Sequence, residues 1–176
     1  MTIIAGFKTK AYPPEKRSSR SIMKNKRTEI IIPKDRAIFW LDKNGRWHNA
    51  HGEFEHKKII AYFHSSIKRD ENGYYLSQRR QNVHEKVYFH YEDTALFAVD
   101  LIKDDVVTLI LNTGKQIRLR PRNLFIRGDD LYMRMGEETI KFTDRALVKI
   151  SDLLEYDNTL YFIKINDRRY KIRQSE

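Results

Sequence analysis

The sequence contains no cysteine, only four prolines and only seven glycines among its 176 residues. The missing cysteines exclude disulfides, thiolate metal sites and a cysteine nucleophile, and they fit a reducing cytoplasm. The scattered glycines form neither a Gly-x-Gly-x-x-Gly fingerprint nor a P-loop, so no phosphate cradle of either kind is expected. No apolar run approaches the roughly 20 residues that span a bilayer. We therefore expect a cytoplasmic protein with no membrane span.

The positive charge is concentrated at one end of the chain. Of the net charge of +10, residues 1–36 carry +7, from ten lysines and arginines against three acidic residues. This segment shows no helical or strand period and is predicted to be a basic, flexible arm that precedes ordered structure from Ala37, although Ile30–Ile32 suits a short strand. The arm is either a solvated tail, an attachment to nucleic acid or an anionic surface, or a segment that docks on its own domain or a partner. The basic residues concerned are Lys16, Arg17, Arg20, Lys24, Lys26 and Arg27.

The first ordered part is predicted to contain one helix between strands. Residues 37–49 form a hairpin pattern around Asp42-Lys-Asn-Gly45, and Glu55–Lys68 has apolar residues on one helical face. A turn ends this helix at Gly73. A strand follows, then a polar loop over 77–82, then strands near 87–91 and 96–99.

The second part repeats this pattern. Further strands are predicted near 106–111, 116–120, 131–133 and 138–142, then a helix over 144–155 and a hairpin between 160 and 172. The apolar face of the second helix matches that of the first after a shift of 87 residues, which takes Phe63 to Ile150. The predicted fold is α+β, a strand-rich body of two similar halves, 37–103 and 104–176, which share the core. Several strands are expected at sheet edges, where pairing between chains can occur.

No catalytic residue, metal or cofactor is predicted. His48, His51 and His56 fall across strand, turn and helix start, so no two rings share one helical face, and His64 lies two turns beyond His56. No serine sits in a nucleophile elbow. The acidic pair Glu92-Asp93 lies in a predicted turn, where such residues have local roles.

Two groups of residues are candidates for binding. The first is a groove for a ligand or partner, with core aromatics and structural ion pairs as the alternative for its members: Trp47, Tyr75, Lys86, Glu92 and Asp93. The second is a basic surface for phosphate or an acidic partner, with a solvated face as the alternative: Arg79, Arg80, Arg118, Arg120 and Arg122.

A set of short motifs in the order found here resembles the bacterial domain-of-unknown-function family twelve-eighty-five. The resemblance covers about residues 38–175, and it departs from the family pattern at Asn82-Val83, where a proline is expected. It implies an α+β fold built from a repeat and a role in signalling or regulation. The motifs are Gly45-Arg-Trp47, Gly52, Ile59-Ile60 with Phe63, Asp70 with Gly73 and Tyr75-Leu76, Glu85-Lys86-Val87, and Glu92-Asp93-Thr94.

We therefore expect a non-catalytic binding or regulatory module that recognises a protein or a small molecule. One alternative is a nucleic-acid-associated protein that binds through the basic arm. The second alternative is a hydrolase-like enzyme with a site that shows no known signature.

Overall fold

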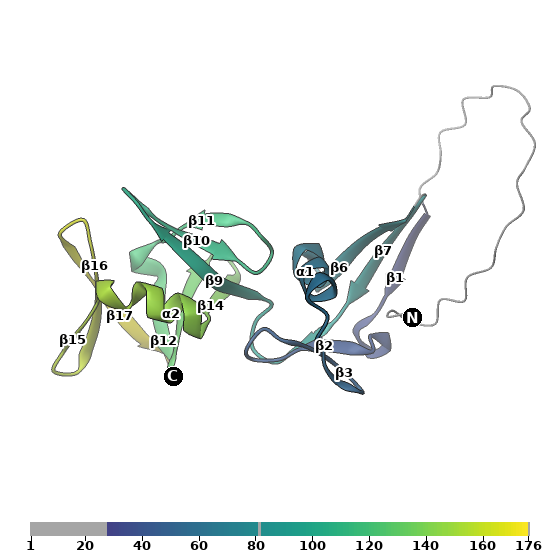
Figure 1. Cartoon of the computed structure of the whole chain (residues 1–176), viewed down its shortest axis with the longest axis horizontal. Helices are drawn as coiled ribbons and strands as arrows, with labels where there is room; N and C mark the ends of the chain where they lie inside the picture. Colours follow the sequence, from purple (N-terminus) through teal and green to yellow (C-terminus); the bar gives the residue numbers. More distant parts are fainter. Residues whose placement is uncertain (1–27, 81, 176) are drawn as a thin grey trace, which may run out of the picture.

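The computed structural model describes residues 28–80 and 82–175, which form two halves side by side along the long axis of the molecule (Figure 1). In the first half, two four-stranded sheets have the strand orders β1-β7-β6-β5 and β4-β3-β2-β8, and helix α1 packs against β6. The elements of this half are β1 (Thr28–Ile32), a 3-10 turn (Lys34–Arg36), β2 (Phe39–Leu41), β3 (Trp47–Asn49), β4 (Gly52–Glu53), α1 (Lys57–Ser66), β5 (Ile67–Asp70), β6 (Gly73–Arg80), β7 (Val83–Tyr88) and β8 (His90–Tyr91).

The second half is one nine-stranded sheet with the order β11-β10-β9-β14-β13-β12-β17-β16-β15, and α2 packs on β9 (Figure 1). The predicted α+β class is thus confirmed. The elements of this half are β9 (Leu96–Lys103), β10 (Val107–Leu111), β11 (Gln116–Arg118), η2 (Pro121–Asn123), β12 (Leu124–Arg127), β13 (Asp130–Met135), β14 (Glu138–Phe142), α2 (Asp144–Ile150), η3 (Ser151–Leu153), β15 (Leu154–Asp157), β16 (Leu160–Ile165) and β17 (Arg168–Ser175).

The two halves share a strand order. In the second half six strands run β14-β13-β12-β17-β16-β15, and the first half has β4-β3-β2 followed by β8 and β7, which are nearly continuous, and then β6-β5. In each half, the strand of this set that comes first in the sequence pairs in parallel with the one that comes last. These pairs are β2 with β8, at Trp40 opposite His90, and β12 with β17, at Phe125 opposite Arg173. The predicted sequence repeat stays a prediction, because this correspondence concerns strand order and not the residues themselves.

Aromatic side chains fill the core of the first half. The Trp47 ring lies 4.9–5.7 Å from the rings of Phe39, Phe63 and Phe89, in edge-to-face contacts. This cluster is continuous with the aliphatic core of the second half. The turn between β2 and β3 touches that half directly: Gly45 has a positive φ of 79°, and a Cβ there would lie 3.0 Å from the Phe97 ring. Only glycine tolerates both this positive φ and such close contact with the Phe97 ring.

Residues 77–82 do not form the predicted polar loop, and both helices end earlier than predicted. Strand β6 runs to Arg80 and pairs with β7 through Ser77 opposite Lys86 and Gln78 opposite Glu85, so the turn is much tighter. Any residue with a backbone N–H group can form strand hydrogen bonds, so these polar residues pair as a strand although their composition is typical of a loop. Ile67 begins β5, and Leu154 begins β15, because each of these segments gains a hairpin partner in place of a further helical turn.

The boundaries of the parts also differ from the sequence-based ones. Strand β1 lies upstream of Ala37 and pairs in parallel with β7, so residues 28–32 of the predicted arm belong to a sheet. Strand β9 falls within the predicted first half, 37–103, but it pairs with β10 and β14 of the second half. The six basic arm residues named above lie outside the described residues. Within the described part of the chain, no helix has the length and apolar character to cross a membrane.

Candidate functional site

The five residues of the predicted groove are distributed over three places. Trp47 is only 1 % exposed and belongs to the aromatic core, so it cannot line a surface groove. Tyr75 and Lys86 lie diagonally across the paired strands β6 and β7, with Tyr75 opposite Tyr88 and Lys86 opposite Ser77. Glu92 and Asp93 lie in the segment between β8 and β9, where the two halves meet.

Lys86 and Tyr75 belong to a cluster that ties together the four strands of one sheet. The Lys86 ammonium lies 5.3 Å from the centroid of the Tyr75 ring and forms ion pairs with Glu29 on β1 (3.3 Å) and Asp70 on β5 (3.5 Å). The Tyr88 hydroxyl donates a hydrogen bond of 2.8 Å to Asp70. The hydrogen bond to Glu29 raises the pKa of Lys86. These contacts satisfy the charges within the sheet, which indicates a structural role.

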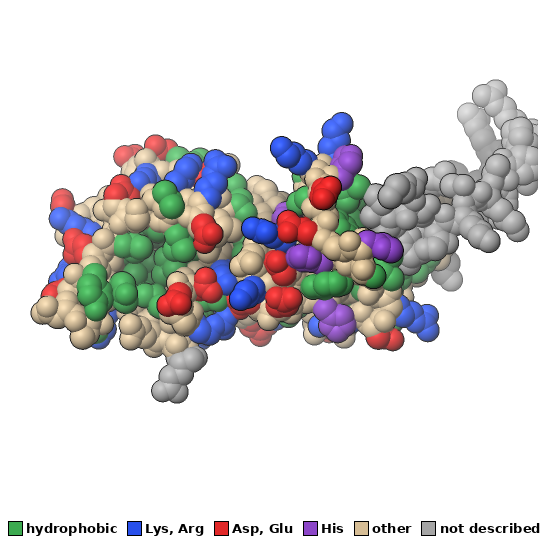
Figure 2. All heavy atoms as spheres, turned by 60° about the horizontal axis from the view of Figure 1, so that its bottom comes forward, with side chains coloured by type: hydrophobic (Ala, Val, Ile, Leu, Met, Phe, Trp, Pro, Cys, Tyr) green, Lys and Arg blue, Asp and Glu red, His purple; other side chains and the backbone are tan. Residues whose placement is uncertain are grey.

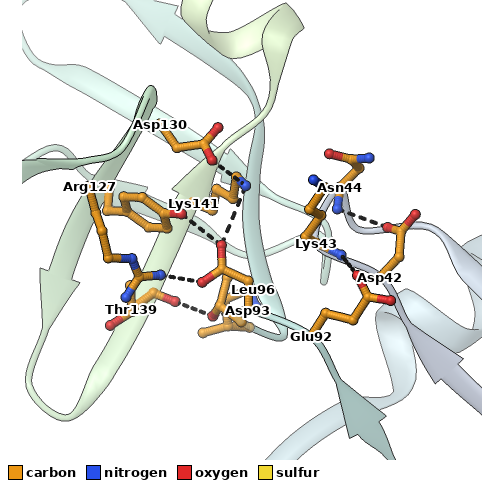
Figure 3. A network of polar contacts seen from close by, with 12 residues as sticks. Asp42, Lys43, Asn44, Glu92, Asp93, Leu96, Arg127, Asp130, Thr139 and Lys141 are labelled. Carbon is orange, nitrogen blue, oxygen red and sulfur yellow. Dashed lines mark hydrogen bonds and ion pairs between the residues drawn. The ribbon is translucent and has the colours of Figure 1, made fainter.

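Glu92 and Asp93 are adjacent but reach into different halves (Figure 3). Glu92 Oε2 accepts a hydrogen bond from the backbone N–H of Lys43, in the turn between β2 and β3. Asp93 points the other way, where it pairs with Arg127 and accepts a hydrogen bond of 2.7 Å from the Tyr132 hydroxyl. The two carboxylates thus fasten the connecting segment to both halves.

Lys141 completes the cluster around Asp93. Its ammonium lies 2.7 Å from Asp130 and 3.4 Å from Asp93, and its side chain is only 8 % exposed (Figure 3). Burial alone would lower the pKa of Lys141, but the hydrogen bond to Asp130 and the nearby Asp93 charge outweigh it, and the pKa is raised. A lysine held in its charged form between two carboxylates is a poor nucleophile or base, so this cluster also indicates a structural role.

The histidines have separate local partners. His48 Nε2 lies 3.0 Å from Asp42 Oδ2, and His64 Nε2 lies 3.2 Å from the backbone carbonyl of Gly45. Over residues 28–80 and 82–175, no group of three or more His, Asp or Glu side chains is arranged to hold a metal ion.

His64 is expected to make stability fall on mild acidification. Burial against Trp47 lowers its pKa below the usual 6.5, although the hydrogen bond to Gly45 opposes the shift. As the pH falls through 6.5 towards this lower value, the unfolded chain binds the proton first, so folding stability is full above 6.5 and declines below it. The urea midpoint of the wild type should therefore fall more than that of His64→Gln between about pH 7.5 and pH 5.5. Equal declines in both proteins would contradict this expectation.

The predicted basic surface is also divided. Arg79 is exposed on β6 opposite His84, and Arg80 ends the same strand. Arg118, Arg120 and Arg122 belong to the second half, on β11 and around η2. Arg118 and Arg122 line two different hollows. The positions of the predicted basic surface are therefore split between the two halves.

Arg122 instead belongs to a hollow with two arginines that the sequence did not single out. The hollow has a volume of about 480 Å³, and its cationic residues are Arg122 on η2, Arg134 on β13 and Arg173 on β17. We call it the arginine hollow. Among the described residues, no acidic side chain lines it and none of these three guanidinium groups forms an ion pair. Its remaining lining residues are Asn123, Leu124, Phe125, Gly136, Gln174 and Ser175.

The sheet holds the arginine hollow in shape. Arg173 pairs with Phe125 across β17 and β12, and the Arg134 guanidinium lies 5.4 Å from the centroid of the Phe125 ring. That ring in turn stacks on Tyr132 at 5.2 Å. The Asn123 side-chain amide donates a hydrogen bond of 2.9 Å to the backbone carbonyl of Arg134, which fixes η2 to β13. The arginine hollow is therefore a cationic concavity on a rigid support.

Some arginines of the second half do have carboxylate partners. Arg127 pairs with Asp93, Arg145 with Asp100 at 2.7 Å and Arg169 with Glu155 at 2.8 Å, whereas the hollow brings together three arginines without such a partner among the described residues. A guanidinium group binds carboxylate or phosphate oxygens with two parallel hydrogen bonds. Three such groups with no acidic neighbour in the described part of the chain can hold an anion that carries several oxygens.

Comparisons with known proteins bear on the fold. No family model matches the chain, and no curated protein matches its sequence. A crystal structure of a DUF1285 family protein from Silicibacter pomeroyi DSS-3 matches with a TM-score of 0.57 at 16% identity, over 82% of this chain and 83% of that one. A DUF1285 family protein from Shewanella baltica OS155 matches with a TM-score of 0.48 at 16% identity, over 65% of this chain and 91% of that one.

The chain thus shares the fold of a DUF1285 protein, that is, of domain-of-unknown-function family twelve-eighty-five. The predicted resemblance is confirmed at the level of the fold. The family name assigns no activity, so the function has to be argued from the chain's own residues.

Proposed function

We propose that this protein is a non-catalytic binding module whose arginine hollow holds a phosphate-bearing ligand. The observation that carries the proposal is the convergence of Arg122, Arg134 and Arg173 on one concavity that no acidic residue of 28–80 or 82–175 lines. A phosphate group offers two negative charges and several acceptor oxygens, which suit three guanidinium groups better than a single carboxylate does.

The lining residues support binding rather than catalysis. They include no histidine, carboxylate or lysine that could transfer a proton at neutral pH. Binding without chemistry is what a regulatory role requires. The arginines are well exposed, so the affinity should be moderate and should fall with added salt.

The test is calorimetric titration of the full chain with pyrophosphate at low ionic strength. The wild type should bind, and the triple variant Arg122→Gln/Arg134→Gln/Arg173→Gln should bind at least about tenfold more weakly, because it loses three charged hydrogen-bond donors. The matched control is Arg36→Gln/Arg79→Gln/Lys115→Gln, which removes the same charge from exposed positions outside the hollow. This control should retain most of the affinity.

Equal weakening in both triple variants would show that only net charge matters and would overturn the proposal, as would a wild type that does not bind. A single-stranded oligonucleotide tests the nucleic-acid alternative in the same way. If the oligonucleotide binds but pyrophosphate does not, and deletion of residues 1–27 abolishes that binding, the basic arm and not the hollow is the binding element. The deletion stops at residue 27 because Thr28 begins β1.

A further inference from the structure

The last strand of the nine-stranded sheet, β15, has an unpaired edge that differs from its counterpart in the first half. Strand β15 pairs with β16 on one side, and among the described residues no strand lies on its other side. The side chain at its centre, Tyr156, is 63 % exposed. A free edge with an exposed apolar side chain is a template for pairing with another chain.

The corresponding edge of the first half is protected. Strand β5 occupies the same position after the shift of 87 residues, and there Arg69 stands where β15 has Tyr156. Arg69 forms an ion pair of 3.1 Å with Glu137, in the turn between β13 and β14. The edge of β5 thus carries a charge and contacts the other half, which are two common ways to block edge pairing. Neither protection applies at Tyr156.

The hairpin geometry directs the free hydrogen-bonding groups of Tyr156 outwards. A two-residue turn makes Asp157 and Leu160 a hydrogen-bonded pair, and such pairs alternate along an antiparallel ladder. Tyr156 therefore occupies a non-hydrogen-bonded position toward β16, so its N–H and C=O face the free edge. Two copies of β15 related by a twofold axis can exchange these groups, with Tyr156 opposite Tyr156.

The side chains of the edge suit this arrangement. On one face, the Tyr156 ring lies 4.8 Å from Tyr161, so a symmetric pair would build a continuous row of four tyrosine rings across the two molecules. On the other face, Glu155 would lie opposite Asp157 of the second copy, but in each molecule Arg169 binds both carboxylates, at 2.8 Å and 3.3 Å. The single guanidinium cancels half of the charge of the two carboxylates, which lowers the repulsion that would otherwise oppose the contact.

The surroundings of Tyr161 are apolar as well. Tyr161 lines a hollow of about 400 Å³ together with Leu147, Leu154 and Ile172, on the side of the sheet that carries α2. Figure 2 shows hydrophobic side chains gathered on this half of the molecule. A twofold axis perpendicular to the sheet would place the two hollows on the same side of the joined sheet. A partner copy thus extends an apolar surface that is already present.

We infer that the protein self-associates as a symmetric dimer through antiparallel pairing of its β15 edges, centred on Tyr156. The inference does not depend on the proposed function, because Arg173 and Ile172 are consecutive on β17 and point to opposite faces of the sheet. The arginine hollow and the tyrosine row therefore lie on different faces. Because a four-residue edge is short, the dimer should be weak, with a Kd between about 1 µM and 1 mM.

Sedimentation velocity of the full chain over this concentration range tests the inference. The wild type should shift from monomer to dimer, and Tyr156→Arg, which installs the residue found in β5, should raise the Kd at least tenfold. The matched control is Val148→Arg, since Val148 is an apolar residue of α2 that is 75 % exposed and lies off the edge. This control should dimerise like the wild type. A wild type that stays monomeric throughout, or a Tyr156→Arg protein that dimerises as well as the wild type, would overturn the inference.

The absence of cysteine allows a direct test of the geometry. Residues in a hydrogen-bonded antiparallel pair have Cα atoms about 5.5 Å apart, which is within the range a disulfide spans. Tyr156→Cys should therefore give a covalent dimer under mild oxidation, and Val148→Cys should not. A wild-type dimer together with no cross-link through Cys at 156 would refute the proposed pairing.

Discussion

Replacement of Trp47 by alanine is expected to lower the free energy of unfolding by about 3–5 kcal/mol, the usual cost of removing a buried aromatic side chain. The ring is in contact distance of Phe39, Phe63 and Phe89, so the deletion opens a cavity that rigid neighbouring rings cannot fill. Urea unfolding followed by circular dichroism measures the change. Trp47→Phe should cost clearly less, because the indole N–H has no hydrogen-bond partner and phenylalanine retains most of the packing.

The other tryptophan is the matched control for this experiment. Trp40 lies on the neighbouring strand, is 36 % exposed, and stacks on His48 at 5.6 Å. Trp40→Ala should therefore lower the free energy of unfolding by at most about 1–1.5 kcal/mol, because the Trp40 side chain is only partly buried. Equal losses for the two variants would show that Trp47 is not the centre of the core and would reopen its role in a binding groove.

Asp93→Asn should produce the second large effect, a loss of about 2–4 kcal/mol, because it leaves a buried lysine short of one counter-ion. Asparagine can still accept the hydrogen bond from Tyr132, but it cannot neutralise Arg127 and Lys141. The loss of stability should be smaller than for a buried lysine with no counter-ion at all, because Lys141 keeps its ion pair with Asp130 at 2.7 Å. Denaturant unfolding of both proteins at neutral pH measures it.

Glu92→Gln is the natural comparison, since Glu92 is the adjacent carboxylate. Its contact with the Lys43 backbone N–H lies at the surface, and glutamine can still accept that hydrogen bond. We expect a change within about 0.5 kcal/mol, as for most surface substitutions. If Glu92→Gln costs as much as Asp93→Asn, the connecting segment and not the buried lysine determines the stability of the junction.

The sequence predicts local structure well where it contains characteristic turn residues or apolar residues at regular helical spacing. The Asn44-Gly45 pair marks a hairpin turn that the structure contains, because these residues favour the backbone angles of tight turns. The turn predicted at Gly73 is also present, but it closes the hairpin of β5 and β6 and does not directly end a helix. The helical face around Phe63 is likewise present, with Phe63 buried and Ile59 and Ile60 packed against the core. These signals act over a few residues, and no distant partner is needed to recognise them.

Contacts between distant segments account for what the sequence did not show. The parallel pairing of β1 with β7 joins residues about 55 positions apart, and β1 directly follows a strongly basic segment, so the sequence around it resembles a tail. The arginine hollow draws on three elements between Arg122 and Arg173, whose spacing carries no period. The one available signal was the alternation of charged and apolar residues along β17, which indicates that Arg173 faces away from the core.

The position of β17 in the sheet has a consequence for the order in which the protein folds. This strand ends at Ser175, yet it lies between β12 and β16 and is not at an edge. During synthesis the hairpin of β15 and β16 therefore has no place to attach until the following strand has left the ribosome. The first half is complete once β8 is made, so it can fold while the second half is still being translated. Late closure of the sheet by β17 should appear as a slow phase in refolding of the full chain. Weakening the pairing of Phe125 with Arg173 should lengthen this phase, whereas shortening either half at its start should not remove it.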